Sequence, residues 1–197
     1  MNLISNNCVG GWIYKELNNG YNNPFVWNII QDESFLYLIN NFSKIDFKNR
    51  YLTTAKIPQV KNRDVFAIEV DNSFVITYPH YVMDCKYENP TRCKSDFTGW
   101  DIRYKNIDEY ILNKYDERSD RMLVNKEQPL FLLDTSISTL ETNKKFEDLN
   151  FKRIMCITRN NYTPAKDDTK YVSLGGCSTL LRAKKIIEKY KSYIINE

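Results

Sequence analysis

The opening stretch of the chain predicts a strand, a glycine-containing loop and a helix in direct succession: Leu3-Ile4-Ser5, then Asn6-Asn7-Cys8-Val9-Gly10-Gly11, then Trp12-Ile13-Tyr14-Lys15-Glu16-Leu17. The same order recurs near the end, where 171–174 is followed by Gly175-Gly176-Cys177-Ser178 and a helix through Ile195. Such units at both ends favour an α/β fold, because strands that alternate with helices form a mainly parallel sheet. In these folds ligands collect at the carboxyl ends of the strands.

Strands and helices also alternate between the two ends. Helices are predicted over 33–42 with Asp32 as N-cap, over 107–122, and from the capping box Ser138-Thr139-Leu140-Glu141 to about 148. Strands are predicted over 129–134, 153–158 and 171–174, with a β-hairpin formed by 65–70 and 74–77. We therefore expect one α/β domain over residues 1–197, a three-layer sandwich whose mainly parallel sheet carries a β-hairpin addition.

Composition and charge exclude several classes of protein. The 197 residues are 42% apolar and 27% charged, which is typical of a globular protein rather than a disordered one. The net charge of +3, with both signs mixed along the chain, is too small to predict nucleic-acid or membrane-surface binding. No apolar run reaches the ~20 residues that span a bilayer, and the N-terminus lacks a signal-peptide pattern, so a cytoplasmic protein with cysteines as thiols is expected.

The opening loop is the strongest candidate for a site. Gly10 and Gly11 allow close backbone approach, and amides at the start of a helix can bind an anion or a developing oxyanion, aided by the side chains of Ser5, Asn6 and Asn7. Cys8 lies at this helix start, where the helix dipole is expected to lower the pKa of a thiol. The alternative is that the glycines only permit a tight turn and that Cys8 is a small buried apolar residue.

His80 is the only histidine, so any imidazole acid–base step must use it. It follows the second strand of the predicted hairpin, and Pro79 stiffens the turn. Cys8 and His80 would form a nucleophile–base pair if the fold brings them within ~3–4 Å. The alternative is a surface or hydrogen-bonded structural histidine.

Other segments give weaker signals. Trp100 and Arg103 could stack on a ring or hold a phosphate, or belong to a salt-bridged loop with Trp100 as a core anchor. The 175–178 segment could be a second anion-binding helix start, although Ser178 as an ordinary N-cap explains it equally well. Asp134 ends a strand where an orienting acid would lie, and the basic terminal helix is interpreted as a solvated face. His80, Cys85 and Cys93 lack paired metal-ligand spacing, so no metal is expected.

Two linked motifs carry a family resemblance: Ile4-Ser5-Asn6-Asn7-Cys8-Val9-Gly10-Gly11-Trp12-Ile13-Tyr14 and Tyr21-Asn22-Asn23-Pro24-Phe25-Val26. They resemble a family of bacterial proteins labelled as a domain of unknown function or as exopolysaccharide-biosynthesis proteins, in which Ser is usual at the position of Asn23. More distantly, the strand with its Asn-Cys loop looks like the WcbI-type capsular polysaccharide acetyltransferases, which bind coenzyme A. This resemblance implies acyl transfer from a CoA thioester to a sugar hydroxyl or amine.

Carried over by residue, Cys8 matches the loop cysteine of that family and His80 its histidine. Ser5, Asn6, Asn7, Gly10 and Gly11 match the loop that would stabilise an oxyanion. The resemblance therefore implies a cytoplasmic CoA-dependent acyltransferase, in the simplest case an acetyltransferase using acetyl-CoA, that acts on a small-molecule sugar or sugar-nucleotide acceptor in polysaccharide biosynthesis.

Two routes are open for this reaction: His80 deprotonates an attacking acceptor, or Cys8 first takes the acyl group. For an amino sugar, already a good nucleophile, the direct route is favoured. The alternative functions are a Cys/His thiol hydrolase or esterase, and a non-catalytic glycan- or nucleotide-binding domain.

Overall fold

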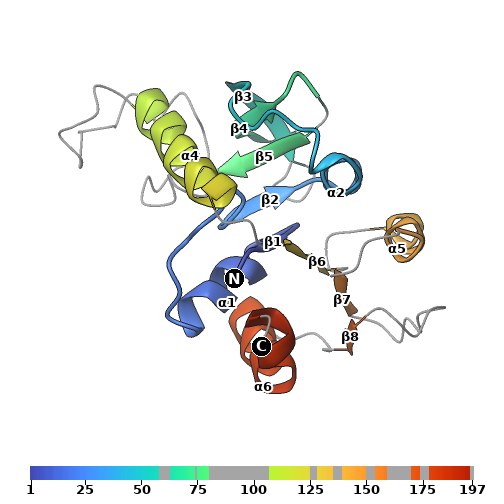
Figure 1. The fold of residues 1–197 in the computed structure, drawn as a ribbon. Helices are drawn as coiled ribbons and strands as arrows, with labels where there is room; N and C mark the ends of the chain where they lie inside the picture. Colours follow the sequence, from blue (N-terminus) through green and yellow to red (C-terminus); the bar gives the residue numbers. More distant parts are fainter. Residues whose placement is uncertain are drawn as a thin grey trace.

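The computed structural model describes residues 1–57, 63–73, 75–79, 107–124, 128–134, 139–149, 154–158, 170–173 and 178–195. Within these ranges the strands form two four-stranded sheets (Figure 1). One sheet is parallel and the other antiparallel, which confirms the α/β class and the mainly parallel sheet.

The parallel sheet has the strand order β1-β6-β7-β8. Its strands are β1 (Leu3–Ser5), β6 (Leu130–Asp134), β7 (Ile154–Thr158) and β8 (Lys170–Ser173). In the register, Leu3 lies opposite Leu130, and Phe131 opposite Ile154. The first strand of the chain thus pairs with a strand more than a hundred residues later, so their carboxyl ends lie at the same edge.

Helices cover both faces of this sheet. On one face α1 (Val9–Glu16) packs against α6 (Thr179–Ile195), and on the other lies α5 (Leu140–Glu147) (Figure 1). Alternate residues of each strand point to opposite faces. Ile4, Phe131 and Cys156 enter one apolar core, whereas Leu3, Leu130 and Met155 enter the other, beneath α1 and α6. This arrangement is the expected three-layer sandwich.

The hairpin is confirmed and is part of a larger antiparallel sheet. Its strands β4 (Arg63–Val70) and β5 (Val75–Pro79) pair with β3 (Arg50–Ile57) and β2 (Asn28–Ile30) in the order β2-β5-β4-β3. Asp71 and Asn72 have φ values of 60° and 47°, as the tight hairpin turn requires. Strands β2 and β3 were not predicted from the sequence.

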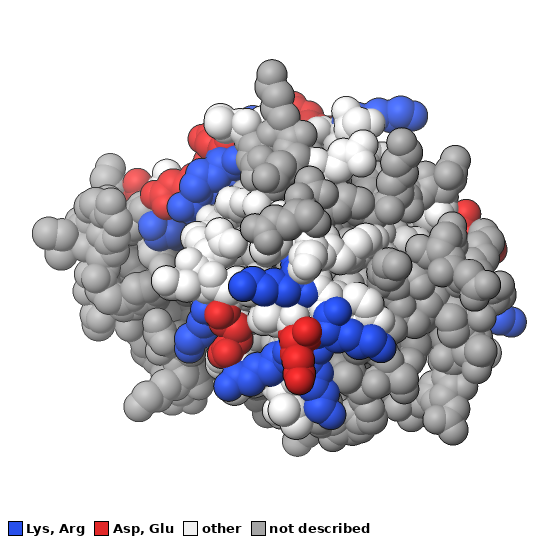
Figure 2. Space-filling model, turned by 60° about the horizontal axis from the view of Figure 1, so that its bottom comes forward, with Lys and Arg blue, Asp and Glu red and all other residues white. Residues whose placement is uncertain are grey.

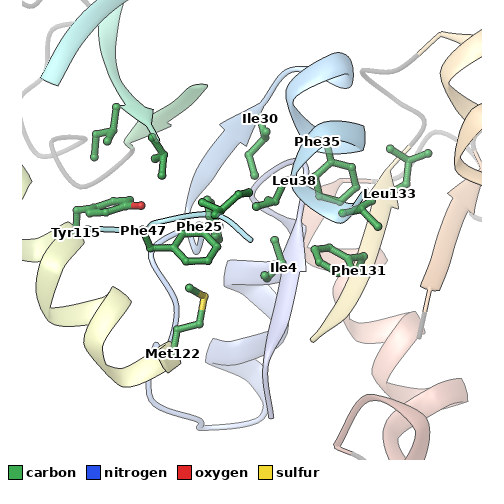
Figure 3. Packing of buried hydrophobic residues seen from close by; sticks show 14 of the residues in the cluster. Ile4, Phe25, Ile30, Phe35, Leu38, Phe47, Tyr115, Met122, Phe131 and Leu133 are labelled. Atoms are coloured by element: carbon green, nitrogen blue, oxygen red, sulfur yellow. The ribbon is translucent and has the colours of Figure 1, made fainter. Parts of the chain in front are cut away.

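The first apolar core fills the space between the two sheets. Figure 3 shows Phe35 and Leu38 of α2 (Asp32–Asn41) beside Phe131 and Leu133 of β6, with Tyr115 and Met122 of α4 (Ile107–Val124) closing the cluster. The Phe35 and Phe131 ring centroids are 6.1 Å apart in an edge-to-face contact. This packing places β2 and α2 beside the carboxyl end of β1.

Three helix starts differ from the expectation by a few residues. Helix α1 begins at Val9, so Gly10 and Gly11 lie inside the helix rather than in the loop. Gln31, not Asp32, is the N-cap of α2. Thr139 caps α5, because its side chain accepts a hydrogen bond from the amide of Thr142; the predicted capping box is therefore shifted by one residue.

Candidate active site

The loop between β1 and α1, residues 6–8, lies at the carboxyl edge of the parallel sheet. Strand β1 continues into α1 on one face, and its neighbour β6 precedes α5 on the opposite face. In open α/β sheets ligands bind outside the carboxyl ends of the strands. Asp134 is the last residue of β6, and it therefore lies beside this loop.

Each of the three polar side chains before Cys8 makes two hydrogen bonds. Ser5 Oγ donates to the Asn7 carbonyl at 2.5 Å and accepts from the Gly10 amide at 3.1 Å. The Asn6 amide group exchanges two bonds with the backbone of Asp134, at 3.1 and 2.8 Å. Asn7 donates to Asp134 Oδ2 and accepts from the Val9 amide, both at 2.9 Å. The loop therefore has one fixed conformation tied to β6.

Asp134 connects this loop to the last helix. Its Oδ2 accepts from Asn7 and also from Nη1 of Arg182 in α6, in an ion pair whose side chains are 0% and 4% exposed. Nη2 of Arg182 donates to the Thr179 hydroxyl at 3.2 Å. A buried carboxylate is tolerated only where such partners compensate for its lost hydration.

The two glycines of α1 are explained by close packing rather than by a turn. A Cβ on Gly10 would lie 3.2 Å from Cβ of Ser5 and still nearer its hydroxyl, and one on Gly11 would lie 2.6 and 2.7 Å from two ring atoms of Trp27. The interpretation that the glycines only permit a tight turn is therefore wrong. They let α1 approach β1 on one side and an indole ring on the other.

Cys8 is the one residue between Asn2 and Gly11 that is not buried. It stands just before the first turn of α1, at the carboxyl edge of the parallel sheet. Burial of its surroundings raises the pKa of the Cys8 thiol to about 11, although a hydrogen bond with its own backbone amide acts in the opposite direction. The expected lowering of this pKa by the helix dipole is therefore wrong, because desolvation outweighs it.

A stripe of accessible side chains continues from Cys8 along α1. Trp12 and Lys15 follow at i+4 and i+7, which places them on the same helix face, and Trp12 is partly exposed and Lys15 exposed. The Lys15 ammonium lies 4.9 Å from the centre of the Trp12 ring, and Trp12 meets Trp27 edge to face at 5.2 Å. A thiol, an indole and a cation thus lie in a row, about 10 Å long by the helical rise per residue.

The second motif, at 21–26, is a structural clamp. The Asn23 amide donates to the Leu3 carbonyl at 2.8 Å and to the hydroxyl of the fully buried Tyr14 at 3.0 Å. The Tyr14 hydroxyl also accepts from the Leu3 amide at 3.0 Å. Asn23 therefore joins α1, β1 and the segment that leads into β2.

Three residues from the middle of the chain were expected at the site together with this loop. His80, Trp100 and Arg103 all lie outside the described residues, as do Gly175 and Gly176. The carbonyl of Asn6 accepts from the amide of Ile30 at 2.9 Å, and Ile30 pairs with Thr77 of β5, which ends at Pro79. The end of the strand that precedes His80 is thus fastened to the Cys8 loop through β2.

The comparisons with known proteins bear on this same region. A family described as a domain of unknown function, DUF1919, matches residues 1–175. The chain belongs to the DUF1919 family. No curated protein matches it. The matched range contains Ser5, Cys8 and Asp134, whereas Thr179 and Arg182 of this DUF1919 protein lie beyond it.

The structure tests two predictions made from the sequence for this site, one for the terminal helix and one for Asp134. The terminal helix was interpreted as a solvated face, but Arg182 is only 3% exposed; that interpretation is wrong for this residue because Arg182 pairs with Asp134. Asp134 was singled out as a candidate orienting acid, and the structure places it at the centre of the network. The described hydrogen bonds of this loop all go to other residues of the protein. An oxyanion role therefore stays a prediction for Ser5, Asn6, Asn7, Gly10 and Gly11.

Two kinds of feature are absent from the described residues. None of the described helices is long and apolar enough to cross a membrane. In the same part of the chain, no group of three or more His, Cys, Asp or Glu side chains is placed to hold a metal ion. Ser178 is confirmed as a cap of α6, since its hydroxyl accepts from the Leu181 amide at 3.4 Å.

Proposed function

We propose that this protein is a CoA-dependent acyltransferase, in the simplest case an acetyltransferase, that modifies a sugar or amino sugar during polysaccharide biosynthesis. The observation that carries the proposal is the position of Cys8: the buried Ser5 and Asn7 beside it form hydrogen bonds that fix the loop, and Cys8 itself is partly exposed at the carboxyl edge of the parallel sheet. Such placement favours a site over a packing role for this residue. The CoA donor and the sugar acceptor come from the resemblance of the opening motif to the WcbI-type acetyltransferases.

Cys8 is proposed to line the site rather than to carry the acyl group. The thiolate is the nucleophilic form of cysteine, and with a pKa of about 11 only about one Cys8 thiol in ten thousand is ionised at pH 7. A covalent route would need a further group to remove this proton. The direct route does not need the thiolate.

In the direct route, the acceptor amine or hydroxyl attacks the carbonyl carbon of the thioester. The new C–N or C–O bond forms, the C–S bond breaks, and His80 takes the proton of the acceptor and returns it to the departing sulfur. The positive end of α1 faces the carbonyl oxygen on which negative charge develops. The buried, hydrogen-bonded loop holds that helix end in place.

The described residues fit the chemistry of CoA. Its adenine ring and phosphates require a flat apolar surface and a cation, and Trp12 and Lys15 supply these groups on the helix face that begins with Cys8. CoA supplies an activated acyl group as a thioester. We therefore assign Cys8 to the reactive end of the donor, and Trp12 and Lys15 to its nucleotide end.

The test is an acyl-transfer assay with acetyl-CoA and a panel of amino sugars and sugar nucleotides. Release of the CoA thiol that requires an acceptor supports the proposal, with mass spectrometry identifying the acetylated sugar. Thiol release that ignores the acceptor supports the hydrolase instead, and no release with any acceptor together with no acetyl-CoA binding overturns the proposal in favour of a binding domain.

Four variants separate the roles of the residues. Cys8→Ala should retain turnover by the direct route, and its complete loss with intact folding would establish the covalent route. Lys15→Ala should raise KM for acetyl-CoA several-fold with kcat little changed, whereas His80→Gln should lower kcat. Lys185→Ala, an exposed lysine on α6, is the matched control for Lys15→Ala and should change neither constant.

A further inference from the structure

We propose that Arg182 is a positioning residue of the Cys8 site, so that the terminal helix α6 completes a site whose other described residues lie in the family-matched part of the chain. The inference rests on the site proposed above, but it does not depend on the identity of donor or acceptor. It concerns what holds Cys8 in place.

A continuous series of contacts leads from Arg182 to the residues on both sides of Cys8. Arg182 Nη1 donates to Asp134 Oδ2, and the same oxygen accepts from Nδ2 of Asn7 at 2.9 Å. The other end of the Asn7 amide accepts from the Val9 amide, at the first residue of α1. Cys8 lies between Asn7 and Val9, so its backbone is fixed on both sides by one side chain.

The charge on Arg182 keeps water away from Asp134 and so preserves the contacts that lead from Arg182 to Val9. Asp134 is fully buried, and a buried carboxylate that loses its cation recovers its hydration only if water enters or if it takes up a proton. Water that enters at Asp134 competes with the Asn7 amide for the carboxylate oxygen to which this amide donates. The bond that orients the Cys8 loop is therefore lost with the charge.

Arg182 also lies where a packing role alone would not place an arginine. Its helix neighbours on the buried face, Ala183 and Ile186, are apolar and enter the core beneath α1. Asp134 is inside the matched range of the family and its described cation partner, Arg182, is outside it. The segment after 175 thus contributes a charge to the site and not only a covering layer.

The test is the rate at which iodoacetamide alkylates Cys8 in the folded full-length protein, followed peptide by peptide with mass spectrometry. When the loop opens, the pKa of Cys8 should fall from about 11 toward its ordinary 9.0, which raises the thiolate fraction at pH 8 by up to about a hundredfold. We expect Arg182→Met to increase the Cys8 rate at least tenfold and to shift its pH profile downward. Arg182→Lys, which restores the charge, should return the rate to within about threefold of the unmodified protein.

Two controls keep a structural role distinct from a positioning role. Lys185→Ala is an exposed substitution on the same helix, and Cys156, buried in β7, reports general opening of the sheet in the same sample. A rise at Cys8 without a rise at Cys156 supports positioning. Equal rises at both thiols, or a Cys8 rate within twofold of the unmodified protein, overturn the inference.

Arg182→Gln, which keeps a hydrogen-bond donor for Asp134, replaces Arg182→Met if the latter is recovered unfolded, and the same selective rise is expected. The measurement uses no acyl donor. A protein that alkylates as expected but transfers no acyl group would therefore overturn the proposed function and leave the positioning role in place.

Discussion

Two arginine–aspartate pairs in this protein share their chemistry and differ in their surroundings. Asp134 and Arg182 join β6 to α6 with side chains that are 0% and 4% exposed. Arg50 and Asp116 join β3 to α4 through two bonds, at 2.8 and 2.5 Å, with side chains that are 29% and 27% exposed. The second pair has the two-bond geometry, and only the first lies among residues of the candidate site.

The difference in burial decides what each pair does. Water and salt screen the Arg50–Asp116 pair, so it adds little to stability and its loss leaves both groups hydrated. Removal of one partner of the buried pair instead leaves an uncompensated charge at the carboxyl edge of the sheet. The buried pair therefore lies next to the loop that contains Cys8, where its hydrogen bonds fix the geometry of that loop.

The largest expected effect follows from breaking the buried pair. Arg182→Met should lower the free energy of unfolding by about 3–5 kcal/mol, the usual cost of an unpaired buried charge. Urea denaturation followed by circular dichroism measures this loss. The double variant Asp134→Asn with Arg182→Met removes both charges and should be more stable than Arg182→Met alone; a double variant less stable than the single one would contradict the assignment of the cost to the charge.

Burial at the same edge has a second expected effect, at alkaline pH. The pKa of Cys8 is about 11 in the folded protein and near 9.0 when exposed, so the folded state keeps a proton that the unfolded chain loses. The contribution of this proton to the free energy of unfolding is fully present below pH 9 and is lost as the pH rises through 11. At about 1.4 kcal/mol per pH unit it amounts to about 2–3 kcal/mol at most, and partial exposure of Cys8 reduces it.

The measurement is the unfolding free energy at pH 8 and pH 10.5 for the unmodified protein and for Cys8→Ala. The loss between the two pH values should be smaller in Cys8→Ala, because its share of the alkaline destabilisation is gone. Equal losses in both proteins would show that desolvation of Cys8 is negligible. Both Cys8→Ala and the unmodified protein retain Cys156, so its own raised pKa, about 12, cancels in the difference.

Particular residues show what the sequence could predict. Strand β6 and helix α4 were predicted to within two residues, because a run such as Leu130–Leu133 and a charged helical periodicity are local signals. Strand β2 was missed, since it has three residues and pairs with β5, which is distant in the sequence. Strand β3 was also missed, although its partner β4 is the next strand along the chain. Cys8 was predicted as a site residue from the loop pattern alone.

The buried pair shows what the sequence could not predict. Arg182 belongs to a helix with several lysines, and nothing local separates it from Lys184 or Lys185 except the apolar phase set by Ala183 and Ile186. Its contact with Asp134 crosses 48 residues and depends on the strand order of the parallel sheet. The direction of the Cys8 pKa shift likewise depends on packing by segments that no local pattern contains.

The exposed lysines of α6 differ from the buried Arg182 in their contact with water. Figure 2 shows Lys and Arg grouped with acidic residues on the side of the molecule that carries α1 and α6. Lys184 and Glu16 lie 3.7 Å apart with side chains 54% and 31% exposed. These charges are solvated, as expected for this helix, and Arg182 differs from them by its burial.

A smaller effect is expected from the glycines of α1. Gly11→Ala would place a methyl group within 2.7 Å of the Trp27 ring, and the overpacking should exceed the gain of alanine in a helix, for a net loss of about 1–2 kcal/mol. Gly20→Ala is the matched control, because no atom lies within 4 Å of its added Cβ. Thermal unfolding of the two variants measures the difference, and a Gly11→Ala protein as stable as Gly20→Ala would show that Trp27 moves aside without cost.

The smallest effect is expected from the more exposed of the two ion pairs, Arg50–Asp116. Arg50→Met should lower the free energy of unfolding by less than about 1 kcal/mol, because water hydrates Asp116 when the guanidinium is gone. Asp116 holds the pKa of the Arg50 guanidinium above its usual value, chiefly through their hydrogen bond, so the guanidinium keeps its charge at every pH below that range. Its contribution should therefore fall with added salt, whereas the Arg182→Met loss should persist at 0.5 M NaCl, since the buried pair is not reached by ions. An Arg50→Met loss as large as that of Arg182→Met, or an equal response of both to salt, would mean that burial does not set the difference between the pairs.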